Sequence, residues 1–329
     1  MDQPYRIFGS EMSPYSVKIR AYFRYKGIPH QWLARRQHED EFQKFARLPI
    51  VPLVVTPEGD GIQDSTPIME KLDTLFPDPS IHPDDPTLAF LSALIEEYGD
   101  EWGNKLMFHF RWWHERDQHA VSYALARGMS PDGDTAEVDK ITAMVRERMT
   151  GRGHFVGSSA ATAPLIDGYF DRLLAILEPH LEGRKYLLGG RPAFADFGLA
   201  SQLYEMALDP TAGGIIRARA PNVMAWAMRM MEPHDDGPFE DWDALRPTLE
   251  PLLADAGAHF LPWSTANASA LMAEQEEFSV ELGGATYTQK PQKYHARSLK
   301  VLRERYAAVA DKAALDPILE KAGCLAYLT

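Results

Sequence analysis

The sequence has little cysteine, no long apolar run and a shortage of positive charge. Its one cysteine, Cys324, excludes an intrachain disulfide framework and a zinc site built from several cysteines. No stretch approaches the run of about 20 apolar residues that crosses a bilayer. The opening residues, MDQPYRIFGS, lack the basic and apolar regions of a signal peptide. We therefore expect a soluble, cytoplasmic protein with no membrane partner.

Negative charge dominates the composition. The chain has 47 Asp and Glu against 34 Lys and Arg, a net charge of −13 with neutral histidines. Nucleic-acid binding through a broad basic face is excluded, because such an acidic surface repels phosphate, although local basic pockets remain compatible with it. The 329 residues exceed what one core comfortably holds, so two domains are expected.

Residues 1–79 have the pattern of a compact α/β domain. Strands are predicted at 5–8, 31–33, 53–55 and 61–63, and helices at 13–26, at 39–46 and after residue 66. Ser13 suits the N-cap of the first helix, Pro14 its first position, and Gly27 the place after its end. The predicted order is β-α-β-α-β-β-α. The third helix is expected to bury Ile68, Leu72, Leu75 and Phe76.

Beyond a proline-dense linker at 77–86, the pattern changes to an all-α domain over residues 86–245. Asp85 and Pro86 begin a helix that runs to Trp102 or beyond, and further helices are predicted at 165–177, 195–208 and 223–231. Residues 246–329 form an extension of unknown role. In it, Gly283-Gly284 joins two alternating segments that predict a β-hairpin, and a basic helix is expected over 294–311.

The start of the first helix is the main candidate for chemistry. A helix N-terminus offers unpaired N–H groups and about half a positive charge, which stabilise a thiolate placed there. The Ser13 hydroxyl can donate one more hydrogen bond to the sulfur. The rival hydroxyls for this role are Ser10, Tyr15 and Ser16.

Two further pieces of the same domain complete a ligand site. The backbone of Val51, before Pro52, is held extended, and a cis bond there would offer its N–H and C=O to an extended peptide. Asp64 can bind an ammonium group, and the Ser65 hydroxyl with nearby N–H groups can bind a carboxylate. A thiolate, a short extended peptide and an amino-acid head group together describe glutathione.

The chain resembles the cytosolic glutathione S-transferases, which have a thioredoxin-like first domain and an all-helical second one. The resemblance covers roughly residues 5–235 and rests on three segments: LPIVPLVVTPEGDGIQDSTPIMEKLDTLFP, YLLGGRPAFADFGLASQLYE and RARAPNVMAWAMRM. It implies that Ser13 stabilises the glutathione thiolate, that Val51 pairs with the tripeptide, and that Asp64 and Ser65 bind the γ-glutamyl group. It also implies thiolate attack on an apolar electrophile, a homodimer, and no metal or redox cofactor.

Two departures from this family pattern bear on the ligand site. Ile50 stands where members often carry a basic residue that holds the glycine carboxylate, so that contact is either lost or supplied by Arg35, Arg36 or Arg47. The extension after residue 245 lies outside the common pattern, and it either covers the substrate cleft or builds an interface. A non-catalytic glutathione- or ligand-binding module, or a protein-interaction module on the same fold, is the alternative to an enzyme.

Residues 108–119, FHFRWWHERDQH, combine aromatic and histidine side chains. Some of Phe108, Trp112 and Trp113 are expected to line an apolar substrate pocket beside the thiolate. His114-Glu115 with His119 nearly forms the HExxH zinc motif, but has one residue too many. Positions five apart on a helix point about 140° away from each other. His109 and His114 have the same spacing, so no metal site is predicted here.

Overall fold

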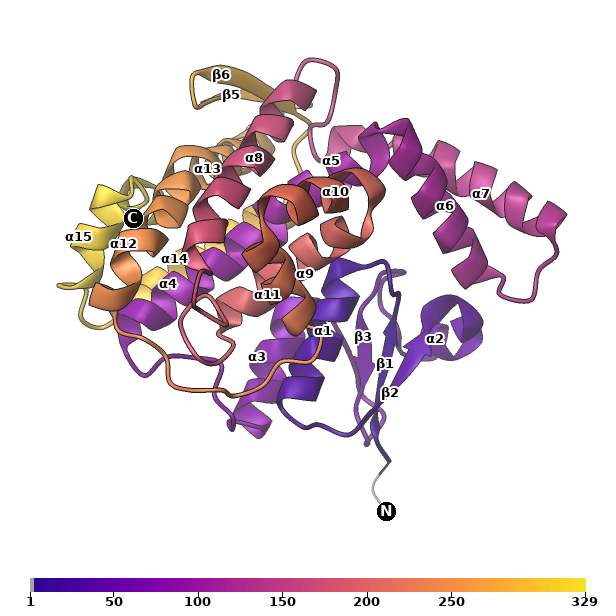
Figure 1. The fold of residues 1–329 in the computed structure, drawn as a ribbon, viewed down its shortest axis with the longest axis horizontal. Helices are drawn as coiled ribbons and strands as arrows, with labels where there is room; N and C mark the ends of the chain where they lie inside the picture. The colour runs from indigo at the N-terminus through magenta and orange to yellow at the C-terminus, as the bar shows by residue number, and fades with distance from the viewer. Residues whose placement is uncertain (1–2) are drawn as a thin grey trace.

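A four-stranded sheet organises the first part of the chain in the computed structural model, which describes residues 3–329 (Figure 1). The strands lie in the order β2 (His30–Ala34), β1 (Tyr5–Gly9), β3 (Leu53–Val55) and β4 (Gly61–Gln63). β1 is parallel to β2 and antiparallel to β3, and β4 is antiparallel to β3. The connecting helices are α1 (Pro14–Tyr25), α2 (Glu39–Phe45) and α3 (Ser65–Leu75). The predicted element order and the thioredoxin-like fold are confirmed.

Local signals account for the ends of these helices. Ser13 is the N-cap of α1, and its Oγ accepts the Ser16 N–H at 3.4 Å. Gly27, just after the end of α1, has φ +62°, which glycine adopts at little cost. In α3 the predicted face is correct at Ile68 and Leu72 but wrong at Leu75, which is 60% exposed.

The error at Leu75 comes from where α3 ends. The 3.6-residue period places Leu75 on the buried face, yet it is the last helical residue. The chain leaves the helix at Phe76, whose backbone has ψ 72°, and the Phe76 ring packs against Tyr5 with 6.1 Å between centroids. The periodic pattern therefore fails at the last residue of the helix, although Leu75 is still helical.

The rest of the chain is helical apart from one hairpin, and no strand lies between residues 86 and 245. The helices of the second domain are α4 (Pro86–Glu97), α5 (Asn104–Trp113), α6 (Glu115–Met129), α7 (Thr135–Thr150), α8 (Ala163–His180), α9 (Phe194–Leu208), α10 (Pro210–Arg219), α11 (Pro221–Arg229) and α12 (Trp242–Asp255). A π-helical segment, Tyr98–Gly103, joins α4 to α5 without a break, so the helix predicted from residue 86 does run past Trp102. Within residues 3–329 no helix is long and apolar enough to span a membrane.

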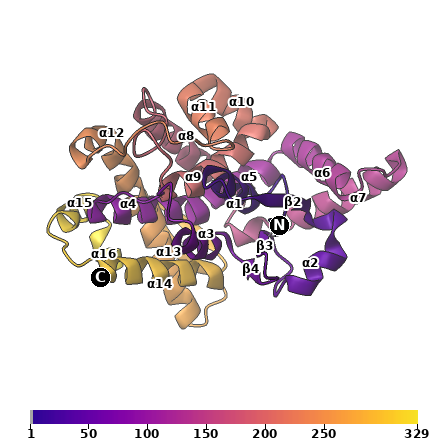
Figure 2. The same ribbon diagram turned by 90° about the horizontal axis from the view of Figure 1, so that it is seen from below.

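The extension packs into the same core as the helices before it. It contains α13 (Leu261–Met272), the predicted hairpin β5 (Phe278–Leu282) and β6 (Ala285–Gln289), α14 (Lys293–Ala308), α15 (Leu315–Lys321) and α16 (Leu325–Leu328). Trp263, Tyr287 and Leu302 are fully buried and belong to one hydrophobic cluster with Trp102. Figure 2 shows α14 beside α3 and α13. Cys324 is buried in the same cluster, and burial raises the pKa of its thiol to about 12.

Buried charges join the two domains. The Lys18 Nζ of α1 lies 2.5 Å from Glu96 Oε1 and 2.6 Å from Asp100 Oδ2, and the side chains of Lys18 and Glu96 are fully buried. Thr66 of α3 accepts a hydrogen bond from Lys18 and donates one to Glu96. Burial raises the pKa of Asp100 to about 7 although Lys18 acts to lower it. This network fixes α1 and α3 against the helical domain.

A second network of buried charges lies beside the loop that precedes α1. Arg111 of α5 pairs with Glu205 and Asp209, each at 2.7 Å. Its Nη1 also donates to the Met12 carbonyl at 2.9 Å, one residue before the N-cap of α1. The loop that leads into α1 is thereby tied to α5 and α9.

Replacing Lys18 by Met tests the first network. The change leaves Glu96 and Asp100 buried without their cation, and we expect a loss of about 3–5 kcal/mol in the free energy of unfolding. Denaturant unfolding of the full chain measures it. Lys300→Met, at an exposed pair with Glu304, is the matched control and should change stability by less than about 1 kcal/mol. Equal small effects of both changes would contradict this role of Lys18.

Candidate functional site

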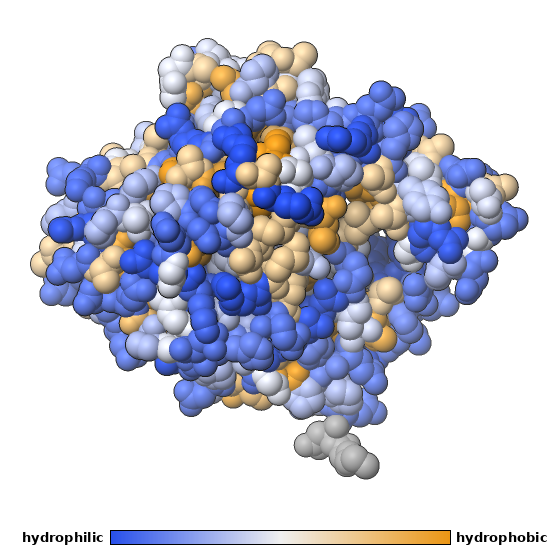
Figure 3. Space-filling model, in the orientation of Figure 1, coloured by the Kyte–Doolittle hydropathy of each residue, from blue (hydrophilic) through white to orange (hydrophobic). Residues whose placement is uncertain are grey.

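A cavity of about 720 Å³ lies where the start of α1 faces α5, α6 and α7. Ser13 and Pro14 line it from the first domain, and Phe108 and Trp112 from α5. In Figure 1 the α6–α7 pair stands beside the sheet domain. Figure 3 shows a mostly hydrophilic face that is hollowed between this pair and the body of the molecule. A small molecule held here would contact both domains.

The cavity lining is rich in methionine and arginine. The methionines are Met12, Met107, Met129, Met144 and Met149, and the arginines are Arg35, Arg36, Arg111, Arg148 and Arg152. Among residues 3–329, no Asp or Glu lines this cavity. Flexible, polarizable thioethers adapt to varied apolar groups. The chain as a whole carries −13, but the lining of this cavity is basic, which favours an anion with an apolar body.

The arginines of this cavity differ in whether an acidic side chain pairs with them. Arg111 is neutralised by its two acidic partners, and Arg35 Nη2 lies 3.2 Å from Glu39. Arg148 and Arg152 form no ion pair within 4 Å in the described chain. Of the five arginines, they are therefore the two without an acidic partner, since Arg36 also lies 3.8 Å from Glu39.

The start of α1 offers unused hydrogen-bond donors to this cavity. Pro14 has no N–H, and no protein group in residues 3–329 accepts the Tyr15 N–H. The Ser13 hydroxyl accepts a bond from the Ser16 N–H but donates to no protein acceptor in that range. Together with the partial positive charge of the 12-residue helix, these donors favour an anion beside Ser13.

The rival hydroxyls are placed less well. Ser16 is fully buried and does not line the cavity. Tyr15 lines it, but its hydroxyl donates to the Asp100 carbonyl at 2.9 Å. Burial, then Glu101 and Asp100, raise the pKa of Tyr15 well above its usual value, so it stays protonated. Ser10 lines an adjoining cavity of about 330 Å³. The geometry favours Ser13.

That adjoining cavity contains the predicted peptide-binding residue. Val51 lines it, and the Val51–Pro52 bond is cis. Arg35 and Arg36 line both cavities, so the two are neighbours. Arg47 lines neither cavity. Of the three arginines considered for the glycine carboxylate, only Arg35 and Arg36 share a cavity with Val51.

Asp64 and Ser65 lie at the start of α3, and both are close to acidic side chains. Asp64 has φ +81° and lines a cavity of about 260 Å³. The other carboxylates around that cavity are Glu70, Glu97, Asp100 and Glu101. Ser65 is almost fully buried, and its hydroxyl donates to Asp100 at 3.5 Å. With five carboxylates against one arginine, Arg297, this surface is acidic and suits an ammonium group.

The extension reaches this acidic cavity. The Tyr294 hydroxyl donates a hydrogen bond to Asp64 Oδ1 at 2.7 Å. The side chains of His295 and Ser298 form hydrogen bonds with the carboxylate of Glu101. Burial raises the pKa of Asp64, although Tyr294 and Lys18 act to lower it. Sequence reasoning missed Tyr294, and no local signal marks it, because its partner lies in the first domain. The extension therefore covers part of the predicted head-group site.

The three aromatic candidates are divided between the cavity and the surface. Phe108 and Trp112 line the cavity. Trp113 is 39% exposed on another face of α5, where its ring stacks on His109 at 5.5 Å between centroids. Adjacent helical residues point about 100° apart, which explains the division.

The fold is a thioredoxin-like domain joined to a helical domain, with a cavity lined by arginine and methionine between them. Residues 7–80 match the family model described as the glutathione S-transferase N-terminal domain, and residues 136–227 match that of the C-terminal domain. The chain belongs to the glutathione S-transferase family.

Several solved structures are similar to this chain. A glutathione S-transferase from Methylobacterium radiotolerans, in complex with glutathione sulfonate, is 18% identical, with 73% of this chain and 97% of that chain covered and a TM-score of 0.42. A glutathione S-transferase from Rhodospirillum rubrum is 19% identical, with 68% of this chain and 86% of that chain covered and a TM-score of 0.44. The β-etherase LigF from Sphingobium is 18% identical, with 75% of this chain and 99% of that chain covered and a TM-score of 0.45. A search of curated proteins gives no match.

An apolar anionic dye tests the character of the large cavity. We expect anilinonaphthalene sulfonate to bind there with increased fluorescence, and Arg148→Gln to weaken its affinity about fivefold, the scale of one partly screened charge pair. Arg246→Gln, an exposed arginine on α12, is the control and should leave the affinity unchanged. Equal affinities in the wild type and Arg148→Gln would contradict an anion site at Arg148.

Proposed function

We propose that this protein is a glutathione transferase that holds the glutathione thiolate at the start of α1 and delivers it to an apolar electrophile. Family membership supports glutathione as the co-substrate. The observation that carries the proposal is the free donor set at Ser13 and the Tyr15 N–H, beside a cavity lined by arginine and methionine.

The distribution of charge supports glutathione as the ligand. Its γ-glutamyl ammonium would lie at the acidic surface around Asp64. The Tyr294 hydroxyl donates to Asp64 Oδ1, so Asp64 Oδ2 would accept a hydrogen bond from the ammonium. Its thiolate would lie at Ser13, and its glycine carboxylate at Arg35 or Arg36 beside Val51. The acidic surface would thus face the ammonium group of the tripeptide, and the basic cavities would face its thiolate and glycine carboxylate.

The chemistry needs only an activated sulfur and a positioned electrophile. Free thiols of this kind have a pKa of about 8.5, so a few per cent is thiolate at neutral pH, and a decrease of about two units makes thiolate the main form. The thiol proton leaves to solvent. The sulfur then forms a bond to the electrophilic carbon, and the leaving group departs with its electron pair. Holding both reactants between the domains supplies the remaining acceleration.

The cavity lining narrows the class of electrophile. Phe108, Trp112 and the methionines would contact an aromatic or aliphatic body. Arg148 and Arg152 would contact an anionic substituent, or negative charge that develops on the leaving group. We infer an apolar electrophile with one acidic or electron-withdrawing group.

Ser13→Ala tests the assignment of the thiolate donor. Loss of one hydrogen bond to a charged sulfur should lower the rate of conjugation to a chromogenic nitroaryl chloride about 10- to 100-fold. Glutathione-concentration series separate the effect on the rate constant from the effect on binding. Ser16→Ala is the matched control on the same helix and should keep the wild-type rate.

Other outcomes of this experiment assign other functions. An unchanged rate in Ser13→Ala would remove Ser13 from the chemistry. Glutathione binding without any turnover would favour the alternative of a binding module. No binding at all would favour a protein-interaction module and contradict the proposal.

Family membership also predicts a homodimer in the cytoplasm. Sedimentation velocity of the full chain should give twice the mass of one chain. A monomer at all concentrations would contradict the dimer and would indicate that the extension, which packs on α4 and contacts Glu70 of α3 through Arg305, takes the place of a partner.

A further inference from the structure

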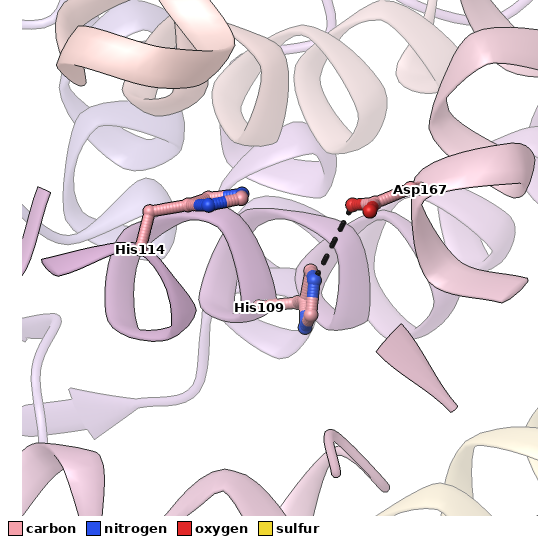
Figure 4. A group of neighbouring side chains, drawn as sticks. All are labelled: His109, His114 and Asp167. Atoms are coloured by element: carbon pink, nitrogen blue, oxygen red, sulfur yellow. Dashed lines mark ion pairs between the residues drawn. The ribbon is translucent and has the colours of Figure 1, made fainter. Parts of the chain in front are cut away.

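Two histidines and an aspartate meet where the end of α5 faces α8, outside the cavities described above (Figure 4). His109 lies on α5, His114 follows its last residue, and Asp167 lies on α8. One possible ligand atom from each lies within 4.8 Å of the others. Figure 4 shows His114 and Asp167 directed toward the same space, with His109 below it.

The facing atoms of this cluster have no hydrogen-bond partners. His109 is fully buried, and its Nε2 is unpartnered. The Nε2 of His114 and the Oδ1 of Asp167 are also buried and unpartnered. Buried polar atoms in native proteins almost always have a partner, and each exception needs an explanation. Three such atoms that lie close together fit a single ligand that bonds all three.

We propose that His109, His114 and Asp167 bind a divalent transition-metal ion, with Zn²⁺ the best fit. The His109 Nε2 lies 3.4 Å from Asp167 Oδ1, beyond a good hydrogen bond. Zinc bonds nitrogen and carboxylate oxygen at about 2.0–2.2 Å in tetrahedral geometry, which separates two ligands by about 3.4 Å. Two imidazoles and one carboxylate are a ligand set that zinc accepts.

The surroundings of His109 prepare it as a ligand. Its Nδ1 lies 2.7 Å from the Ser158 hydroxyl, and donation of the Nδ1–H to that oxygen leaves the lone pair on Nε2, toward the cluster. Trp113 stacks on the ring and fixes its plane.

The site has an entry path and a free coordination position. The Asp167 side chain is 47% exposed, so solvent reaches the outer side of the cluster while Oδ1 faces inward. Three protein ligands leave one tetrahedral position for water. A bound ion would join the α5–α6 turn to α8. Since α5 also carries Phe108 and Trp112, the ion would restrict the motion of the helix that lines one side of the large cavity.

The helical argument against a metal at His109 and His114 is wrong because α5 ends between them. Trp113 is the last helical residue, and His114 has ψ 129°, an extended conformation. The side chain of His114 therefore folds back toward His109 and does not point 140° away. His119 stays on the exposed face of α6 and takes no part in the cluster.

A zinc titration of the full chain tests the proposal. After treatment with a chelator and its removal, Zn²⁺ is added in competition with a chromogenic chelator. We expect one equivalent to bind, and the midpoint of thermal unfolding to rise with it. Asp167→Asn and His114→Gln should each weaken the affinity at least tenfold and abolish the rise. Asp167 is half exposed, so its variant should fold, which circular dichroism checks.

Matched variants separate this site from adventitious binding. His119→Gln removes an exposed histidine next to the cluster, and Asp171→Asn an exposed carboxylate one turn along α8. Both should bind zinc as the wild type does. Absence of stoichiometric binding would overturn the proposal. Binding that survives in both Asp167→Asn and His114→Gln, or that falls equally in His119→Gln, would overturn it as well.

Discussion

The buried contact of Lys18 with Glu96 and Asp100 fixes the position of α1, whose start lines the large cavity. It ties α1 to α4 in a region that water does not reach, so the first helix has one position relative to the helical domain. Arg111 does the same for the loop before α1 through the Met12 carbonyl. Between these two contacts the start of α1 faces α5, and Ser13 opens into the large cavity. The domain interface and the candidate site depend on the same charges.

Segregation of charge is the second organising feature. The chain is acidic overall, yet the large cavity has only arginines among its charged lining residues, and the cavity at Asp64 has five carboxylates. Such separation favours a ligand with positive and negative ends over a simple anion or cation. The extension contributes to the acidic side through Tyr294 and His295, so a segment outside the matched family domains adjoins the expected ligand.

Sequence patterns predicted features that depend on neighbours along the chain. The N-caps at Ser13 and Asp85, the stop at Gly27 and the hairpin at Gly283-Gly284 follow from backbone chemistry within a few residues, and all four are present. Contacts between distant segments were not predictable in this way. The hydroxyl of Tyr294 meets Asp64 only through packing of α14, and no single sequence carries a local sign of that.

Both errors lie at helix ends. At His114 the helical period was extended past Trp113, where α5 ends, and at Leu75 it was applied to the last residue of α3. In both cases the next side chain follows a new backbone direction, inward for Phe76 and back toward His109 for His114. Helix ends are set by caps and by tertiary contacts, which periodicity does not contain.

The pKa of the glutathione thiol bound to this protein tests the account most directly. Difference ultraviolet absorbance of the thiolate, followed against pH with the full chain in excess, gives that value. The donors at the start of α1 predict a pKa about two units below the free value of about 8.5. A bound thiol that titrates at or above the free value would contradict the account, even if glutathione binds tightly.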